Sequence, residues 1–394
     1  MPIARKGRFT RPVRFRLTAA GWVFVVSSGL VGVVALNSRL ALLFVMFGCM
    51  LGALYVSAVI ARRMMAAVHV AREAPRRCWQ NQPVTLSYLL RSAAGGGACL
   101  ALRVQERGRK GDPAIPPAHC GYLPAREDRK GRCEIVPTRR GRIRLGSLRL
   151  STVFPFGLVA ARRQFDQSAS LVVWPGRGRL RTPLLTGGEA ERVAAAPSIR
   201  AGGQDEFYGL REYRPGDNPR WIHWRRSAGR DEPVIREMSH PQPKTLWVVL
   251  DTYVEGGCDE AAAVRERAIR FAATLIDDAL VGGYRVGMAL AYGKRVALLP
   301  PGSRRSQRGR LLDALADVDE NTTWRLADVV GRLRPAVVGE AYVVAVEGAE
   351  AGAAGACDAL VRLRRVSRSL AVVDAARLEE VFVDEGASAA GEGA

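Results

Sequence analysis

Two long uncharged runs near the start of the sequence constrain the fold more than any other feature. Residues 17–36 read LTAAGWVFVVSSGLVGVVAL, and residues 40–61 are again free of charged side chains after a three-residue turn. About 20 helical residues, at 1.5 Å each, cross the roughly 30 Å hydrocarbon layer of a membrane. The sequence therefore predicts a transmembrane helical hairpin over residues 17–61. A cleaved signal peptide is the alternative, but the first run is too long and no A-x-A site follows it.

The charges that flank these runs predict how the hairpin is oriented. Six basic residues and no acidic residue precede the first run, and five basic residues follow the second run, opposed by Glu73 alone. The positive-inside rule then places both chain ends in the cytoplasm. We expect a protein of the plasma (inner) membrane with two spans, a basic cytoplasmic N-terminus over residues 1–16, and soluble domains in the cytoplasm. Thiols stay reduced there, so six cysteines are expected to be buried fillers: Cys78, Cys99, Cys120, Cys133, Cys258 and Cys357.

The net charge of +21 raises the question of a nucleic-acid partner. The chain has 59 Lys and Arg against 38 Asp and Glu, and only five of the basic residues are Lys. An excess of Arg over Lys also fits a high-GC codon bias. Apart from those that flank the spans, the basic residues are spread over the soluble regions and are not gathered into one binding module. We therefore expect a membrane partner and no nucleic-acid partner.

Residues 70–180 predict a β-rich domain that resembles a sandwich. Short alternating runs are separated by clusters of Gly, Pro and Asn, as in small antiparallel folds. The expected strands are Val84–Leu90, Cys99–Gln105, Gly131–Pro137, Arg142–Leu150 and Ala169–Trp174. The segment Phe154–Leu158 reads as a turn, because Pro fixes φ and Gly permits a positive φ.

The densest motif of the chain lies in a signature segment, residues 200–238. Residues 207–237 read FYGLREYRPGDNPRWIHWRRSAGRDEPVIRE. The pattern predicts a tight turn at Pro215, a helix that is capped by Asp217 or Asn218 and ends near Gly229, and then a strand over Pro233–Met238.

Two Trp and several Arg in so short a segment are open to three interpretations. They can anchor the fold through cation–π contacts, they can form a protein-binding hot spot, or they can bind phosphates or nucleic acid. The candidate partner-binding residues are Asp217, Trp221, Trp224, Arg225 and Arg226.

Residues 239–384 alternate strand and helix, which predicts a three-layer α/β domain with a mainly parallel sheet. The expected strands are Lys244–Asp251, Tyr284–Tyr292, Lys294–Leu299, Ala341–Glu347 and Leu370–Asp374. The expected helices are Asp259–Val281, Ser306–Val318, Trp324–Leu333 and Ala356–Arg365. The small, polar residues 385–394 are expected to form a disordered tail.

At this point two motifs carry a resemblance. The segment GLREYRPGDNPRWIHWRRSAGRDEPVIRE resembles the signature of the "domain of unknown function 58" (DUF58) family, and RRGRIRLGSLRLSTVFPFGL resembles the stretch that precedes it. The resemblance implies a von Willebrand factor A-like terminal domain behind a two-span anchor. Members are commonly encoded beside MoxR-type AAA+ ATPases and transglutaminase-like membrane proteins, so these are the partners that it implies. It implies no general biochemical activity.

The resemblance also raises the question of a metal. A von Willebrand A domain holds Mg²⁺ with Asp-x-Ser-x-Ser after its first strand, a Thr loop and a later Asp, all oxygen ligands. Here Asp251 matches the first position, whereas Tyr253 and Glu255 replace the two serines. The remaining candidates are Thr322, within Asn321–Thr323, and Glu347. Because Tyr is too bulky to replace Ser simply, we expect no metal and no cofactor, with Mg²⁺ as the alternative.

These features predict a non-catalytic, membrane-anchored interaction or scaffold protein that presents its α/β domain to a partner. The partner that the resemblance implies first is a MoxR-type AAA+ ATPase system. The alternative is a metal-dependent hydrolase that uses Asp251 and Glu347 in a degenerate metal site. The sequence lacks the GxSxG, HExxH and GxxxxGK[ST] patterns, which argues against an enzyme.

Overall fold

A computed structural model describes residues 12–384 of the chain, with gaps. The gaps are residues 39, 94–96, 109–113, 182–205, 216, 218, 230–231, 240–243, 255–258, 294, 304, 320–321, 323, 340 and 349–353. The chain divides into two compact units, residues 1–176 with 315–317, and residues 177–314 with 318–394. Most of the basic N-terminus, the start of the signature segment and the expected disordered tail lie outside the described residues.

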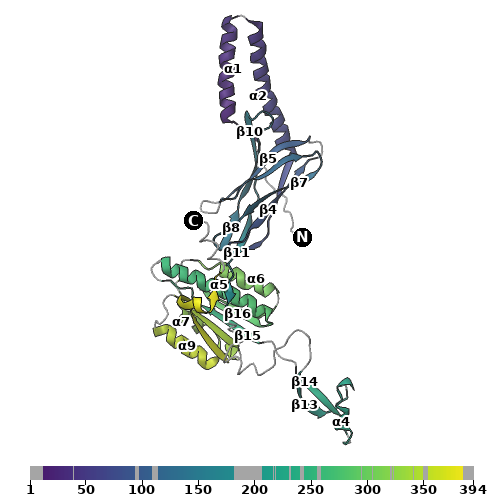
Figure 1. Cartoon of the computed structure of the whole chain (residues 1–394), viewed down its shortest axis with the longest axis vertical. Helices are drawn as coiled ribbons and strands as arrows, with labels where there is room; N and C mark the ends of the chain where they lie inside the picture. Colours follow the sequence, from purple (N-terminus) through teal and green to yellow (C-terminus); the bar gives the residue numbers. More distant parts are fainter. Residues whose placement is uncertain are drawn as a thin grey trace. The chain divides into compact units, whose positions relative to one another are not determined.

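The two uncharged runs form helices α1 (Ala19–Ser38) and α2 (Ala41–Ala67), which lie side by side (Figure 1). Both are long and apolar enough to cross a membrane. Helix α2 continues six residues past the predicted end of the span at residue 61. It continues because Met64 and Met65, beyond the exposed Arg62 and Arg63, are buried in the core of the following domain.

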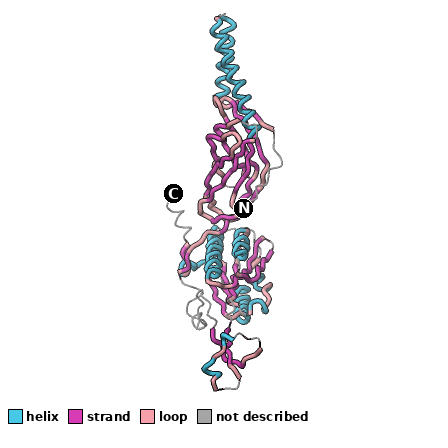
Figure 2. The backbone as a smooth tube through the Cα atoms, turned by 90° about the vertical axis from the view of Figure 1, so that its right-hand side faces the viewer, coloured by secondary structure: helices cyan, strands magenta, loops and turns pink. Residues whose placement is uncertain are grey.

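An all-strand domain completes the first unit, and Figure 2 shows it in magenta next to the two cyan helices. Its strands are β1 (Arg14–Leu17), β2 (Val68–Glu73), β3 (Arg77–Trp79), β4 (Val84–Ser92), β5 (Cys99–Arg107), β6 (Ala118–Leu123), β7 (Asp128–Ile135), β8 (Gly141–Leu145), β9 (Ser147–Thr152), β10 (Val159–Phe165) and β11 (Ala169–Trp174). They form a five-stranded sheet (β1-β10-β9-β5-β6) and two three-stranded sheets (β2-β4-β7 and β3-β11-β8). One apolar core joins the three sheets, including Leu86, Leu102 and Leu171.

The five expected strands of this domain are confirmed as strands, although β7 ends at Ile135 and not at Pro137, and one of the five is divided. The run Arg142–Leu150 is two strands, β8 and β9, which belong to different sheets and are separated by Gly146. Ile143 and Leu145 are buried before this glycine, and Leu148 and Leu150 after it, so the extra residue exchanges the faces of the strand. A side chain at Gly146 would also place its Cβ 2.3 Å from the carbonyl oxygen of Arg107.

Strand β1 was not predicted, and it places the end of the basic N-terminal flank in the five-stranded sheet. Residues 14–17 pair antiparallel with β10, so the helical hairpin is inserted between two strands of one domain. The first helix therefore begins at Ala19 and not at Leu17, because Leu17 makes a strand pair with Val159. A four-residue strand is too short for its alternation to be recognised in the sequence.

Both ends of the hairpin are fastened to β10 and to the turn before it. Thr18 caps α1: its hydroxyl accepts a hydrogen bond from Gly21 N (2.9 Å) and donates to Gly157 O (2.6 Å). Its backbone N–H donates to Leu158 O (3.1 Å). At the end of α2, Arg163 Nη1 donates to the carbonyl oxygen of Met65 (2.8 Å), and burial lowers the pKa of this guanidinium. The predicted turn at Phe154–Leu158, in which Gly157 has φ +72°, thus anchors the start of the first helix.

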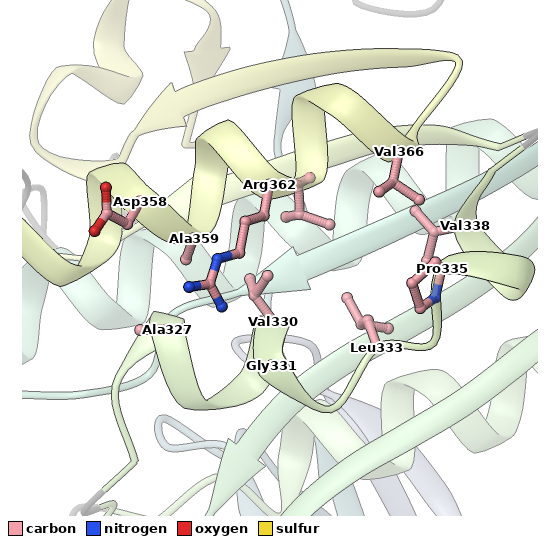
Figure 3. A pocket seen from close by; sticks show the side chains of 11 residues that line it. Ala327, Val330, Gly331, Leu333, Pro335, Val338, Asp358, Ala359, Arg362 and Val366 are labelled. Atoms are coloured by element: carbon pink, nitrogen blue, oxygen red, sulfur yellow. The ribbon is translucent and has the colours of Figure 1, made fainter.

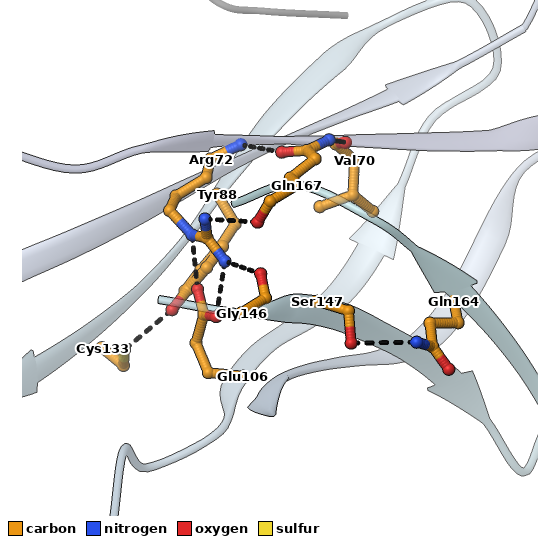
Figure 4. A network of polar contacts seen from close by, with 9 residues as sticks. All are labelled: Val70, Arg72, Tyr88, Glu106, Cys133, Gly146, Ser147, Gln164 and Gln167. Atoms are coloured by element: carbon orange, nitrogen blue, oxygen red, sulfur yellow. Dashed lines mark hydrogen bonds and ion pairs between the residues drawn. The ribbon is translucent and has the colours of Figure 1, made fainter. Parts of the chain in front are cut away.

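A buried ion pair lies inside the sandwich (Figure 4). Arg72 donates from Nε and Nη2 to the two carboxylate oxygens of Glu106, each at 2.6 Å, and the two side chains are 3% and 0% exposed. Arg72 also donates to Gly146 O and Gln167 O, both at 2.8 Å. Burial raises the pKa of Glu106, and the hydrogen bonds from Arg72 oppose that shift. Through these contacts the guanidinium joins β2 to β5 and to the connections at Gly146 and Gln167.

The second unit holds the α/β domain. Its strands are β12 (Arg179–Leu180), β15 (Thr245–Leu250), β16 (Arg285–Tyr292), β17 (Arg295–Gly302), β18 (Tyr342–Glu347), β19 (Ser369–Asp374) and β20 (Phe382–Val383). Its helices are α5 (Asp259–Val281), α6 (Arg305–Ala316), α7 (Leu326–Gly331), α8 (Pro335–Val338), α9 (Ala354–Val366) and the 3₁₀ helix η2 (Ala375–Glu380).

The main sheet of this unit has the order β17-β16-β15-β18-β19, and all neighbours are parallel except β17, which turns back beside β16. Trp247 and Val249 face α7, α8 and α9, and α5 packs on β15 and β16. The helices thus lie on both faces of the sheet (Figure 1), which confirms the expected three layers. The turn between β16 and β17 contains Gly293, which has φ +54°.

Candidate functional site

The signature segment folds into an antiparallel hairpin of β13 (Glu206–Glu212) and β14 (Val234–Ser239). The expected strand over 233–238 is confirmed. The expected continuous helix is wrong: a 3₁₀ turn, η1 (Pro219–Trp221), and a short helix, α4 (Trp224–Ser227), replace it. The helix is interrupted because Ile222 forms a β-bridge with Ile235 and His223 N donates to Val234 O (2.8 Å).

Asp217 does not cap a helix, as the pattern predicted, and the cap of α4 is a different residue, His223. Asp217 closes a turn, because its Oδ2 accepts a hydrogen bond from Arg214 N (2.9 Å) and its own N–H donates to Arg214 O (3.0 Å). The cap of α4 is His223, whose Nδ1 accepts from Arg226 N (3.3 Å). Ser227 holds α4 on the hairpin, since its hydroxyl accepts from Val234 N (2.9 Å).

Three of the five candidate partner-binding residues lie together on α4. Trp224 is 69% exposed, and Arg225 and Arg226 beside it are also exposed. Among the aromatic side chains that are described in the second unit, Trp224 is the only one that is exposed. Asp217 lies in the preceding turn, and the side chain of Trp221 is outside the described part of the chain. Whether these residues bind a partner stays a prediction.

Two of the three candidate metal ligands lie at the carboxyl ends of parallel strands, where ligands of open α/β sheets bind. Asp251 follows β15, and its Oδ1 accepts a hydrogen bond from Tyr253 N (3.1 Å). Glu347 ends β18 and lies in register beside Asp374 at the end of β19. Burial raises the pKa of Glu347, and the neighbouring charge of Asp374 raises it further.

The donors of a magnesium site are only partly present. Tyr253, in place of the first serine, lies under the guanidinium of Arg325, 5.0 Å from the ring centre. Thr322 is buried, and its hydroxyl has no hydrogen-bond partner among the described residues. Glu255 and the neighbours of Thr322 lie outside the described residues. Within the described ranges, no group of three or more His, Cys, Asp and Glu could hold a metal.

An apolar groove that sequence reasoning missed lies between α7, α8 and α9 (Figure 3). Its volume is about 440 Å³, and Val330, Leu333 and Val338 line one side. Arg362 reaches from α9 across the groove towards α7, and Asp358 lies one turn earlier on α9. The groove joins segments that lie some 30 residues apart, so no single run of the sequence signals it.

Comparison with known proteins relates the chain to the family that its motifs suggest. Residues 209–374 match the family described as "Protein of unknown function DUF58". The DUF58 match begins in the signature hairpin and ends with β19. The chain is also 23% identical over 167 residues to "Uncharacterized protein YeaD" of Bacillus subtilis (strain 168), which is 42% of this chain. The chain spans 40% of the length of that relative. Both matches support the predicted relation to DUF58.

Solved structures show weaker likeness. Two structures of a CARDB domain from Pyrococcus furiosus are 12% and 14% identical, cover 27% of this chain and 94% and 86% of theirs, and have a TM-score of 0.20. A superoxide reductase (neelaredoxin) from Ignicoccus hospitalis is 13% identical over 28% of this chain and 83% of its own, with a TM-score of 0.16. These scores are too low to transfer a fold or a function.

Proposed function

We propose that this protein is a membrane-anchored, non-catalytic interaction protein that presents a von Willebrand factor A-like domain and its signature hairpin to a cytoplasmic partner. The observation that carries the proposal is the exposure of Trp224, which begins the short helix α4 and is followed by the exposed Arg225 and Arg226. Trp and Arg are the residues most enriched in protein-binding hot spots. A water-exposed Trp contributes little to folding, so its place in the signature is better explained by binding.

Two features of the fold support the other parts of the proposal. Helices α1 and α2 are long and apolar enough to cross a membrane, and basic residues flank them. The five-stranded sheet, parallel except for its edge strand β17 and covered on both faces, supports a von Willebrand A-like assignment. The partner that the family resemblance suggests is a MoxR-type AAA+ ATPase, and a transglutaminase-like membrane protein is the second choice.

Site-specific crosslinking in the native membrane tests the proposal. A photoreactive amino acid replaces Trp224 in the full chain, and the same amino acid replaces Tyr122 of the first unit as the control, since Tyr122 is 55% exposed. We expect a crosslink to one defined partner from position 224 and none to that partner from position 122. Arg225→Ala should weaken the crosslink. Equal crosslinking from both positions, or none from position 224, would contradict the docking role.

A further inference from the structure

A row of basic side chains crosses the five-stranded sheet of the first unit. The register pairs His119 of β6 with Arg103 of β5, Arg103 with Ser151 of β9, Ser151 with Arg162 of β10, and Arg162 with Arg14 of β1. Residues directly opposite each other in a sheet point to the same face. These five residues, which we call the basic row, therefore share one face.

That face is the outer one, and it is hollowed. The alternate positions Leu102, Leu150 and Ala161 are buried in the core, whereas Arg14, Arg103 and His119 are exposed. A groove of about 390 Å³ is lined by four members of the basic row, all but Arg14.

The basic row lacks counter-charges among the described residues. Arg14, Arg103 and Arg162 form no ion pair with any described acid, although Arg14 and Arg162 lie directly opposite each other. Like charges in that arrangement destabilise a sheet. An arrangement that costs stability and leaves three guanidinium groups unpaired is explained if an anion binds between them.

The β2-β4-β7 sheet of the same domain shows the opposite pattern. There Arg91 pairs with Asp128 at 2.6 Å and Lys130 pairs with Glu73 at 2.7 Å. Arg129 lies 3.5 Å from Glu127. Abundance of arginine in the chain therefore does not by itself explain the basic row, because three basic residues of the neighbouring sheet have acidic partners.

The basic row lies close to the level at which the hairpin leaves the hydrocarbon layer. The uncharged part of α2 ends at Ala61, and the exposed Arg62 and Arg63 follow. Arg162 lies four residues, about 13 Å along the strand, from Leu158, which holds the start of α1. The headgroup layer extends roughly 5–8 Å beyond the hydrocarbon on each side, and an Arg side chain reaches several ångströms further.

Exposed aromatic side chains mark the same level. Trp22 in the first turn of α1 is 61% exposed, and Phe156 in the turn that holds α1 is 59% exposed. Trp and other aromatic residues gather at the membrane–water interface. The end of the sheet near the hairpin thus combines interfacial aromatics with an unpaired basic groove.

We propose that the basic row binds the phosphate headgroup of an anionic phospholipid, so that the end of the five-stranded sheet nearest the hairpin contacts the membrane surface. Arg103 and Arg162 supply the charged donors on the two sides of Ser151, and His119 and Arg14 extend the site across the sheet. The proposal rests on the membrane anchoring proposed above and adds the chemistry of the lipid.

Binding of short-chain lipids to the detergent-solubilised full chain tests the proposal. The probes are dioctanoyl-phosphatidylglycerol, dioctanoyl-phosphatidylcholine and inorganic phosphate, and thermophoresis measures the affinity for each. We expect phosphatidylglycerol to bind at least tenfold more tightly than the other two probes. The double variant Arg103→Gln/Arg162→Gln should lose at least tenfold in affinity for phosphatidylglycerol, since each basic residue near an anionic surface contributes roughly fivefold, and two contribute roughly 25-fold.

Two further variants separate this result from non-specific charge and from misfolding. Arg129→Gln/Arg132→Gln removes the same charge from the β2-β4-β7 sheet and should change the affinity less than twofold. Arg103→Lys/Arg162→Lys keeps the charge and should retain most of the binding. The proposal is overturned if the control pair loses as much as the test pair, if phosphatidylcholine binds equally, or if inorganic phosphate binds as tightly as the lipid. Extraction of the wild-type protein from membranes by alkaline carbonate would instead contradict the anchoring itself.

Discussion

Removal of one charge from the buried Arg72–Glu106 pair should destabilise the first unit strongly. In Glu106→Gln, Arg72 remains buried and charged at 3% exposure, opposite an amide that cannot accept both of its hydrogen bonds. Breaking such a pair costs about 3–5 kcal/mol. At roughly 2–4 °C per kcal/mol for a unit of this size, the melting temperature should fall by roughly 6–20 °C. Circular dichroism or fluorescence of the full chain in detergent measures that shift.

An exposed pair in the same domain is the matched control. Arg91 and Asp128 form an equally short contact of 2.6 Å, but their side chains are 62% and 37% exposed. Asp128→Asn should therefore cost about 1 kcal/mol or less. The apolar double variant Arg72→Leu/Glu106→Leu should recover much of the loss, because no unpaired charge stays buried. A Glu106→Gln shift no larger than that of Asp128→Asn, or a double variant as unstable as the single one, would refute this reasoning.

Three further predictions concern single residues. Gly21→Ala should destabilise the anchored end of α1 by about 1–3 kcal/mol in thermal unfolding, because its Cβ would lie 2.1 Å from Leu158 O, whereas Gly29→Ala, with open space around it, should be nearly neutral. Burial raises the pKa of Cys78 from 9.0 to about 11, so about a hundredfold less thiolate is present at pH 8, and iodoacetamide should label it far more slowly than the exposed Cys357. Equal labelling rates would count against that burial. Millimolar Mg²⁺ should leave the melting temperature of the full chain unchanged. A shift that disappears in Asp251→Ala would favour the hydrolase alternative, since a specific site adds about 2.7 kcal/mol at 100-fold over Kd.

The sequence predicted the regular elements of the second unit well, because their signals are local. Helix α5 has the predicted bounds Asp259–Val281, since an apolar face and a Gly282-Gly283 stop both lie within the segment itself. One face of α5 is buried, with Ala268, Phe271 and Leu275 fully inside.

Two of the differences from the prediction depend on pairing partners outside the segment itself. Strand β1 exists because β10, some 145 residues later, offers it an edge. The signature helix is broken because the backbone of Ile222 and His223 bonds to β14 and not to the next helical turn. The local propensity of a segment carries no information about pairing with β10 or with β14.

The candidate sites differ in the same way: one is made of neighbours in the sequence, and the others are assembled from distant segments. Trp224, Arg225 and Arg226 could be selected from the sequence because they are neighbours in it. The basic row collects its members from five strands, and only the observed register shows that Arg14, Arg103 and Arg162 share a face. The groove under Arg362 depends in the same way on three helices that pack together.

The central claim is that the protein is anchored in the membrane with its second unit in the cytoplasm, where the proposed partner acts. The direct measurement is the activity of alkaline phosphatase, which is active only outside the cytoplasm, when it is fused to the C-terminus of the full chain. A second fusion places the enzyme after Ser38, in the turn between α1 and α2. The account predicts high activity from the fusion in the turn and none from the C-terminal fusion. High activity from the C-terminal fusion would contradict it.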